Sequence, residues 1–286
     1  GGGDRDFIAL NYFGNRFSYN EFFSNIELCA RSLREYGVRP GDIVTICCPN
    51  MPEAIYAFYA CNKIGAIADM VHPLSSDDQI ENYLNNSKSR ILILVDFDYE
   101  KFCDVIPNTK VYKTILISPR DSMPSLLGLG YLLTKDLKVK IPKNTEKFMY
   151  WYNFLEKGNL YNKDVFIRRT KENDAVILHS GGTTGTPKNI VLTNGNINSI
   201  MEQAKIIFND IGPGDKFLSI LPMFHCFGLV VNICCPLMFS AEVILIPQFD
   251  AKRFDKLIRK YQPNILLGVP TLFEALIKNP YMQGLD

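Results

Sequence analysis

Nine residues in the middle of the chain combine small hydroxyls, glycines and one lysine. They read SGGTTGTPK, begin at Ser180 and end at Lys188, and lie between two apolar runs. Glycines let backbone N–H groups approach an anion without obstruction by a Cβ atom. The hydroxyls add donors, and each hydrogen bond to a charged phosphate contributes about 1.5–3 kcal/mol. The predicted phosphate-binding residues are Ser180, Gly181, Gly182, Thr183, Thr184, Gly185, Thr186 and Lys188.

The common nucleotide P-loop differs from this segment at three points. That motif ends in Gly-Lys-Ser/Thr and leads directly into a helix. Here Pro187 precedes the lysine, Asn189 follows it, and the apolar residues 190–192 are typical of an extended segment. A flexible Gly/Thr linker is the alternative interpretation, but linkers rarely lie directly between a buried strand and another regular element. We therefore expect a phosphate loop of another kind.

A histidine that follows a predicted strand is the second candidate for chemistry. His225 comes after Pro222, Met223 and Phe224, where a sheet would present its imidazole to a ligand. Its residue type and position alone also fit a structural histidine. The other two histidines have weaker cases, and a structural role explains His179 better than a catalytic one.

Helices and strands alternate along the chain, and this alternation predicts the elements that position both candidates. Ser18 and Glu21 form a capping-box signature at the start of the first long helix. Pro-Gly-Asp turns at 40–42 and 213–215 each precede a predicted strand. The predicted strands are 43–47, 66–71, 90–95, 114–118, 175–178, 190–192, 216–221, 242–246 and 264–267, and the main predicted helices are 18–36, 52–64, 77–86, 194–208, 224–239, 250–261 and 270–278.

Such alternation predicts an α/β fold with two units, whose largely parallel sheets pack together. The first unit is expected at 1–170, with an irregular connection at 119–164. Within that connection, 126–133 is predicted to be a short helix packed on the sheet, and the aromatics of 148–152 are expected in the core. The second unit, 171–286, carries the phosphate loop. Because the chain ends without a closing element, we expect this unit to be incomplete.

Composition and charge exclude several classes of function. The 286 residues carry a formal net charge of +1, with 31 basic and 30 acidic side chains, which offers no basic field for nucleic acid. The eight cysteines form no CxxC pair, which favours reduced thiols in a cytoplasmic protein. Three histidines make a metal cluster unexpected. No signal peptide is apparent, and no apolar run reaches the roughly 18 residues of a membrane span. The oligomeric state stays open.

The loop closely resembles the Ser/Thr-rich phosphate loop, commonly written TSGTTGxPK, of the AMP-binding, acyl-adenylate-forming superfamily. Acyl-CoA synthetases, aryl-CoA ligases, luciferases and the adenylation domains of peptide synthetases belong to it. Further segments resemble family motifs in the same order, so that the resemblance covers nearly the whole chain. These are FSYNEF (17–22), GVRPGDIVTICCPNMPEAIYAFYACNKIGAIADMVHP (37–73), LPMFHCFGL (221–229) and GVPTLFEAL (268–276).

The resemblance implies a two-step reaction with ATP, Mg²⁺ and coenzyme A. A carboxylate attacks the α-phosphate of ATP to give an acyl-adenylate and pyrophosphate, and a thiol then takes the acyl group. By the same resemblance, Ser180 lies near the metal and His225 lines the acyl and adenylate pocket as the catalytic candidate. The acyl channel is implied to be bordered by Phe224, Phe227, Gly228 and Val269.

An apolar acid, such as a fatty acid, is favoured by the Phe- and Met-rich segment 223–239. Two alternatives stay open. One is a domain that activates amino or aryl acids and loads a carrier protein. The other is a catalytically silent module that binds a nucleotide or a partner.

The sequence departs from the family pattern at two positions close to the loop. Asn189 stands where many relatives have glycine, and Asn194 stands where many have histidine. The family's adenine-binding motif and its small C-terminal domain, with the catalytic lysine, would lie beyond residue 286. The resemblance therefore implies that Lys188 is not that lysine, and that the 286 residues alone are inactive.

Overall fold

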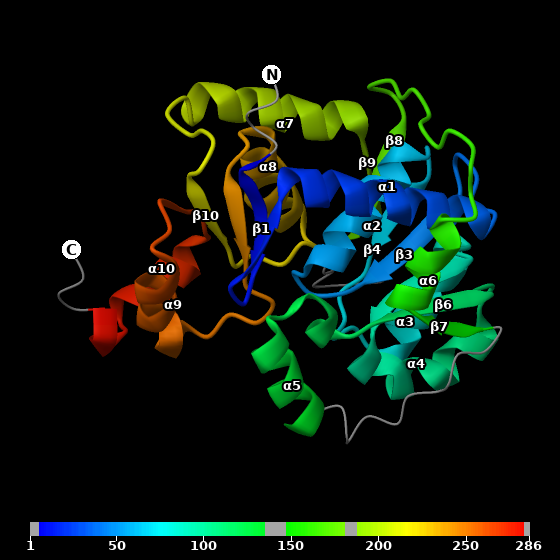
Figure 1. The fold of residues 1–286 in the computed structure, drawn as a ribbon, viewed down its shortest axis with the longest axis horizontal. Coiled ribbons are helices and arrows are strands. Elements are labelled where there is room, and N and C mark those ends of the chain that lie inside the picture. Colours follow the sequence, from blue (N-terminus) through cyan, green and yellow to red (C-terminus); the bar gives the residue numbers. More distant parts are fainter. Residues whose placement is uncertain (1–5, 135–146, 181–187, 283–286) are drawn as a thin grey trace.

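Two sheets of mostly parallel strands lie next to each other in the computed structural model, which describes residues 6–134, 147–180 and 188–282 (Figure 1). Only the pairs β8–β9 and β1–β2 are antiparallel in the described residues. The α/β class and the largely parallel sheets predicted from the sequence are confirmed. The seven-stranded sheet runs, in spatial order, β7 (Phe148–Tyr150), β6 (Lys113–Ile117), β5 (Ile91–Val95), β3 (Ile43–Cys47), β4 (Ile67–Met70), β8 (Asp174–His179) and β9 (Asn189–Thr193). The five-stranded sheet runs β12 (Ile265–Leu266), β10 (Lys216–Ser219), β11 (Glu242–Leu245), β1 (Ile8–Tyr12) and β2 (Asn15–Ser18).

Helices cover both faces of the seven-stranded sheet, and alternate strand residues point to each face. Ile93 belongs to the hydrophobic cluster that includes α1 and α2, whereas its neighbours Leu92 and Leu94 belong to the cluster of α3 and α4. The helices of the first face are α1 (Tyr19–Glu35), α2 (Pro52–Lys63) and α6 (Trp151–Gly158), and those of the second are α3 (Asp77–Ser87) and α4 (Tyr99–Val105). The predicted capping box begins α1: Ser18 accepts from the backbone N–H of Glu21, whose carboxyl accepts from the Ser18 N–H.

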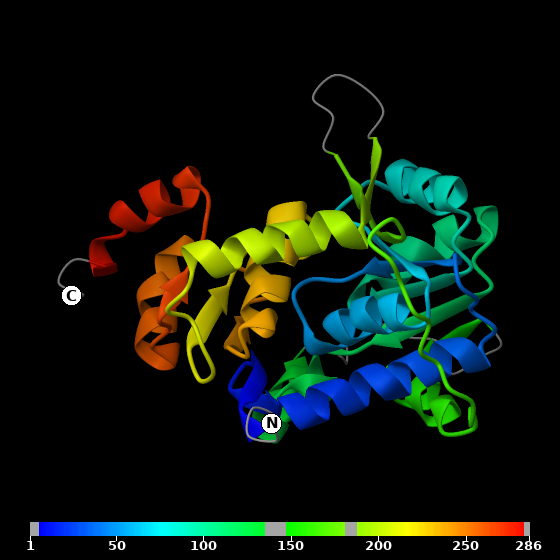
Figure 2. The ribbon, with the colours of Figure 1, turned by 90° about the horizontal axis from the view of Figure 1, so that it is seen from above.

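The five-stranded sheet is also covered on two faces. On one face, Leu218 and Ile244 pack against α9 (Phe254–Tyr261) and α10 (Pro270–Ile277). The other face meets η6 (Phe227–Cys234) and α8 (Cys235–Met238), with α7 (Asn194–Ile207) packed against both (Figure 2). The apolar helix predicted at 224–239 is therefore present, but its first part, η6, is a π-helix. Pro236 lacks the N–H of a regular turn, which disturbs the α-helical pattern at the junction.

Each sheet contains strands from both sides of residue 170. The hairpin β1–β2 joins the five-stranded sheet, where Leu10 pairs with Val243, and β8 joins the seven-stranded sheet beside β4. Asn11 and Arg16 hydrogen-bond the buried carboxyl of Glu242 at 2.6 and 2.7 Å. The predicted boundary at 170 thus does not separate the sheets, because pairing partners lie far apart in sequence. The division of the chain into two domains there stays a prediction.

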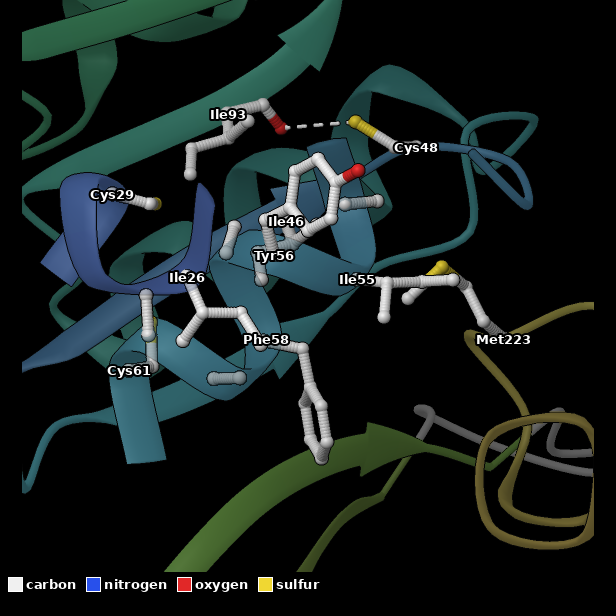
Figure 3. Close-up of a cluster of buried hydrophobic side chains, with 14 of the residues drawn as sticks. Ile26, Cys29, Ile46, Cys48, Ile55, Tyr56, Phe58, Cys61, Ile93 and Met223 are labelled. Carbon is white, nitrogen blue, oxygen red and sulfur yellow. Dashed lines mark hydrogen bonds between the residues drawn. The ribbon is translucent and has the colours of Figure 1, made fainter. Parts of the chain in front are cut away.

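One hydrophobic cluster is shared by the two sheets. Figure 3 shows its centre, where Ile26 of α1 and Ile55 of α2 meet strand residues such as Ile46. Met223, which follows β10 of the other sheet, reaches into the same cluster beside Ile55 (Figure 3). The segment that leads to His225 is therefore anchored in the common core.

The connection 119–164 is more regular than its sequence predicted. It contributes strand β7 and helix α6 to the seven-stranded sheet. Of the aromatics expected in the core, Trp151 is buried and Phe148 and Tyr150 are partly buried against the core, but Tyr152 is 67% exposed, so the expectation is wrong for Tyr152. The predicted short helix exists as α5 (Ser125–Thr134), but its expected packing on the sheet is wrong. Leu126 and Leu133 are 82% and 63% exposed, and α5 packs mainly against η4 (Pro119–Ser122). Figure 1 shows α5 apart from the edge of the sheet that β7 and α6 form.

The two Pro-Gly-Asp turns have the same local structure. Gly41 and Gly214 have φ of +85° and +90°, which side chains rarely adopt. In each turn the aspartate closes the loop by accepting a backbone N–H: Asp42 from Arg39 at 2.7 Å, and Asp215 from Gly212 at 2.9 Å. The repeat therefore begins β3 and β10 in the same way.

All eight cysteines are free thiols. Burial raises the pKa of the Cys47 and Cys48 thiols well above the usual range, which makes both unreactive. In the part of the chain that the structure describes, no helix is both long and apolar enough to span a membrane.

Glu53 is a buried carboxyl at the first turn of α2, and Ser122 donates a hydrogen bond to it. Burial raises its pKa from the usual 4.5 to about 7. The folded state therefore binds this proton more tightly than the unfolded chain does. The resulting stabilisation is complete below pH 4.5 and is lost as the pH rises through 7.

We expect Glu53→Gln to raise the free energy of unfolding at pH 8 by up to about 3 kcal/mol, because glutamine keeps an acceptor for Ser122 and has no charge to bury. At pH 4.5 the variant and the wild type should differ little. Urea unfolding at both pH values tests this, with Glu35→Gln on the exposed side of α1 as the matched control. Equal changes at the two pH values would contradict the assignment.

Candidate functional site

The carboxyl ends of strands from both sheets converge on one region. His72 follows β4, His179 ends the neighbouring strand β8, and His225 lies beyond the end of β10. The ring centroid of His72 lies 6.1 Å from that of His225 and 4.2 Å from that of Phe224. Loops beyond the carboxyl ends of parallel strands are where α/β proteins bind ligands. The structure thus brings His225, as predicted, to such an edge.

The two ends of the predicted phosphate loop, Ser180 and Lys188, are hydrogen-bonded to each other, and we call this pair of residues the neck. The Ser180 N–H donates to the Lys188 carbonyl at 3.0 Å, and the Lys188 N–H donates to Ser180 Oγ at 3.2 Å. The extended segment predicted after the loop is β9. Lys188 is exposed at the neck. The other predicted phosphate-binding residues lie outside the described residues: Gly181, Gly182, Thr183, Thr184, Gly185 and Thr186.

His179, for which the sequence favoured a structural role, is packed directly beneath the neck. Its Nε2 lies 2.7 Å from Oδ1 of Asp69, whose side chain is fully buried. Sequence reasoning overlooked Asp69, although a charged residue within the apolar strand IADM demands a polar partner. Asp69 and His179 meet because β4 and β8 pair in parallel.

His72 and His225 form a pair of imidazoles of lowered basicity. Partial desolvation lowers the pKa of His225. Burial, the neighbouring His225 and the charge of Lys101 together lower the pKa of His72. The Leu74 N–H donates to Nδ1 of His72 at 3.0 Å, which leaves its proton on Nε2 when the ring is neutral. Near pH 7 both rings are therefore mostly neutral, and each can donate one hydrogen bond.

Asn50 fixes the segment that carries His225. Its side-chain amide donates to the carbonyls of Leu221 at 2.9 Å and Ser219 at 3.4 Å, and its oxygen accepts from the Met223 N–H at 2.8 Å. Asn50 is 2% exposed and follows β3, so it links the two sheets at their carboxyl ends. No role for Asn50 was predicted from the sequence, although a buried amide at the end of an apolar strand implies backbone partners.

A cavity of about 440 Å³ opens between the ends of β10, β11 and β12. Phe224 and Val269, two of the four predicted acyl-channel residues, line it. Phe227 does not, and Gly228 packs where a Cβ atom would lie 2.0 Å from the Pro222 carbonyl oxygen. Gly228 therefore serves the close approach of η6 to residues 221–222. The lining consists of Pro49, Asn50, Ile220, Leu221, Pro222, Phe224, Ile246, Pro247, Phe249, Val269, Thr271, Leu272 and Ala275.

Metal binding by the protein alone finds no support in the described residues: no three His, Cys, Asp or Glu side chains gather around a possible ion. Mg²⁺ usually keeps several waters and binds through substrate phosphates together with one or two protein oxygens. The Ser180 hydroxyl at the neck can supply one such oxygen. The residues present therefore fit an ion that arrives with a nucleotide.

Two mostly parallel sheets, with the neck at the carboxyl end of β8, place the chain among the α/β proteins whose ligands bind beyond the strand ends. The family model described as AMP-binding enzyme matches residues 2–285, and the chain belongs to this family.

Curated relatives are ligases that join acids to coenzyme A. A long-chain-fatty-acid–CoA ligase of Bacillus subtilis is 27% identical over 98% of this chain and 50% of its own. The 4-coumarate–CoA ligase 1 of Petroselinum crispum is 25% identical over 99% of this chain and 48% of its own. The chain thus spans about half the length of the curated relatives it matches.

Solved structures share the fold. An ATP-bound MatB from Rhodopseudomonas palustris aligns with a TM-score of 0.78 at 19% identity, over 98% of this chain and 49% of that one. The anthranilate CoA ligase AuaEII, in complex with anthranoyl-AMP, aligns with a TM-score of 0.78 at 18% identity, over 95% and 48%. The chain therefore shares its fold with about half of each of these two proteins.

Proposed function

We propose that the protein activates a carboxylic acid with ATP and transfers the acyl group to coenzyme A. The observation that carries the proposal is the hydrogen-bonded neck, where Lys188 is exposed beside the carboxyl end of β8, while His225 lies beyond the carboxyl end of β10. In the first step a carboxylate oxygen attacks the α-phosphorus of ATP and pyrophosphate leaves. In the second step the thiol sulfur attacks the acyl carbon and AMP leaves.

The described residues have distinct proposed roles in this chemistry. Lys188 offsets charge that develops on the pyrophosphate as it leaves, which is the main electrostatic demand of the first step. Ser180 contributes its hydroxyl to the phosphates and to the Mg²⁺ that accompanies them. His225, largely neutral, donates a hydrogen bond toward the carboxylate of the acid. The loop residues between Ser180 and Lys188 would supply backbone N–H groups to the phosphate oxygens.

An apolar acid is the substrate class that we favour. The cavity next to His225 is lined mainly by apolar side chains, including Phe224 and Val269. Its volume suits the non-polar part of a medium-sized acid. The relatives named above are ligases for long-chain fatty acids and for 4-coumarate, which supports an acid of this kind and coenzyme A as the acceptor.

We propose further that the 286 residues hold the phosphates without completing the reaction. The relatives carry about as much chain again, and the family resemblance assigns to that part the adenine contacts and the catalytic lysine. Eight free cysteines fit a reducing compartment, which we propose to be the cytoplasm.

Exchange of labelled pyrophosphate into ATP by the full-length protein tests the proposal, because only the first step is needed. Panels of fatty, aryl and amino acids are supplied in separate reactions. We expect exchange that depends on a fatty or other apolar acid. Exchange that occurs only with amino acids would indicate the carrier-protein alternative. If none of the acids supported exchange, a silent binding module would be indicated.

A further inference from the structure

A pair of side chains bridges the neck of the phosphate loop. His179 and Asn189 are register partners at the ends of the antiparallel strands β8 and β9. Nδ1 of His179 lies 3.0 Å from Oδ1 of Asn189, within hydrogen-bond distance. This contact, here called the neck bridge, lies one residue below the backbone hydrogen bonds between Ser180 and Lys188. The neck is thus tied by side chains as well as by backbone.

The histidine end of the neck bridge is fixed in the core. Its Nε2 is hydrogen-bonded to Asp69 at 2.7 Å, and the Thr45 hydroxyl donates to the other oxygen of Asp69 at 2.9 Å. Tyr83 stacks on the imidazole, with ring centroids 3.8 Å apart. Three adjacent strands of the sheet, β3, β4 and β8, therefore determine where the ring lies. The sheet therefore holds the ring of His179 in place.

The asparagine end, Asn189, is one of the two positions near the loop at which the sequence departs from the family pattern. The family resemblance places glycine at this position, and glycine has no side chain to reach residue 179. Asn189 is exposed, so burial does not explain its presence. The hydrogen bond to His179 does, because it requires a side chain with a hydrogen-bonding group at this position.

We propose that His179 is a positioning residue for the phosphate loop: held by Asp69, it fixes Asn189 through the neck bridge and so sets how Ser180 and Lys188 face the nucleotide. This inference rests on the proposed function of the loop. Because the neck is already ordered before ATP binds, less conformational entropy is lost on binding. The neck bridge should therefore act on the KM for ATP and leave kcat nearly unchanged, because neither residue touches the reacting atoms.

Substitution of Asn189 tests the inference at an exposed site, in the pyrophosphate exchange assay on the full-length protein. Asn189→Ala removes one hydrogen bond, and we expect the KM for ATP to rise about 3- to 10-fold. Asn189→Gly adds backbone freedom and should raise the KM about 2- to 5-fold further. In both variants kcat should stay within about twofold. Asn198→Ala, an exposed asparagine on α7, is the matched control and should change neither constant.

Substitution of His179 separates positioning from packing. His179→Phe keeps a ring against Tyr83 but loses both hydrogen bonds, so the KM for ATP should rise about tenfold or more. His179→Gln can bridge Asp69 and Asn189 by turning both amides, and should restore the KM to within about threefold of the wild type. His179→Phe also removes a partner of the buried Asp69, so thermal melting is measured for every variant. If a His179 variant folds poorly, the two variants Asn189→Ala and Asn189→Gly decide the outcome.

A wild-type KM for ATP in both Asn189 variants would overturn the inference, as would a loss confined to kcat. Failure of the proposed function gives a different result, since exchange would then be absent from the wild type or independent of Lys188.

Discussion

Replacing Lys188 with alanine is expected to lower kcat/KM for ATP in pyrophosphate exchange by about 100-fold or more. The lysine is exposed at the neck, where its backbone hydrogen-bonds to Ser180, so its amino group is free to reach the departing pyrophosphate. Loss of a charge that acts as pyrophosphate leaves should lower kcat as well as raise the KM. This combination separates the lysine from the neck bridge, which acts on the KM alone.

Lys188→Arg should recover part of the activity, because it restores the charge with a different shape. Lys205→Ala is the matched control: Lys205 is an exposed lysine on α7 that pairs with Glu202 at 2.7 Å, and its loss should leave exchange unchanged. If Lys188→Ala exchanged pyrophosphate at the wild-type rate, the phosphate-binding role of the loop would have to be abandoned.

Asn50→Ala is expected to destabilise the protein by about 2–4 kcal/mol. The truncation leaves the partly buried carbonyl of Leu221 and the buried N–H of Met223 without the partner they have now. It also releases the segment before His225, so the KM for the acid should rise in parallel. Urea unfolding measures the first effect and exchange at varied acid concentration measures the second.

Asn82→Ala, an exposed asparagine on α3, is the control for Asn50 and should change the free energy of unfolding by less than about 0.5 kcal/mol. A similarly small change for Asn50→Ala would show that the two sheets do not depend on this side chain.

Local signals in the sequence predicted much of the fold. The capping box at Ser18, the turns at Gly41 and Gly214 and the alternation of apolar segments each have a cause within a few residues. Pairing between distant segments has no such local signal. The hairpin β1–β2 joins β11 because Leu10 meets Val243, a contact that periodicity cannot indicate.

In the candidate site, too, only the residues with a local signal in the sequence were predicted. The phosphate loop and His225 were identified from motifs that are continuous in sequence. Asp69 and Asn50 were overlooked because their partners, His179 and Met223, lie more than a hundred residues away. Gly228 was assigned to the acyl channel, whereas the structure gives it a packing reason that only the approach of η6 to Pro222 reveals.

Formation of an acyl-adenylate is tested most directly by following an oxygen atom from the acid to AMP. The full-length protein is supplied with ATP, coenzyme A and an apolar acid labelled with ¹⁸O in its carboxyl group, and the nucleotide product is analysed by mass spectrometry. Attack of the carboxylate on the α-phosphorus predicts AMP that carries one ¹⁸O atom, with an equal amount of acyl-CoA. Formation of ADP, or of AMP without the label, would contradict an acyl-adenylate intermediate and with it the function proposed here.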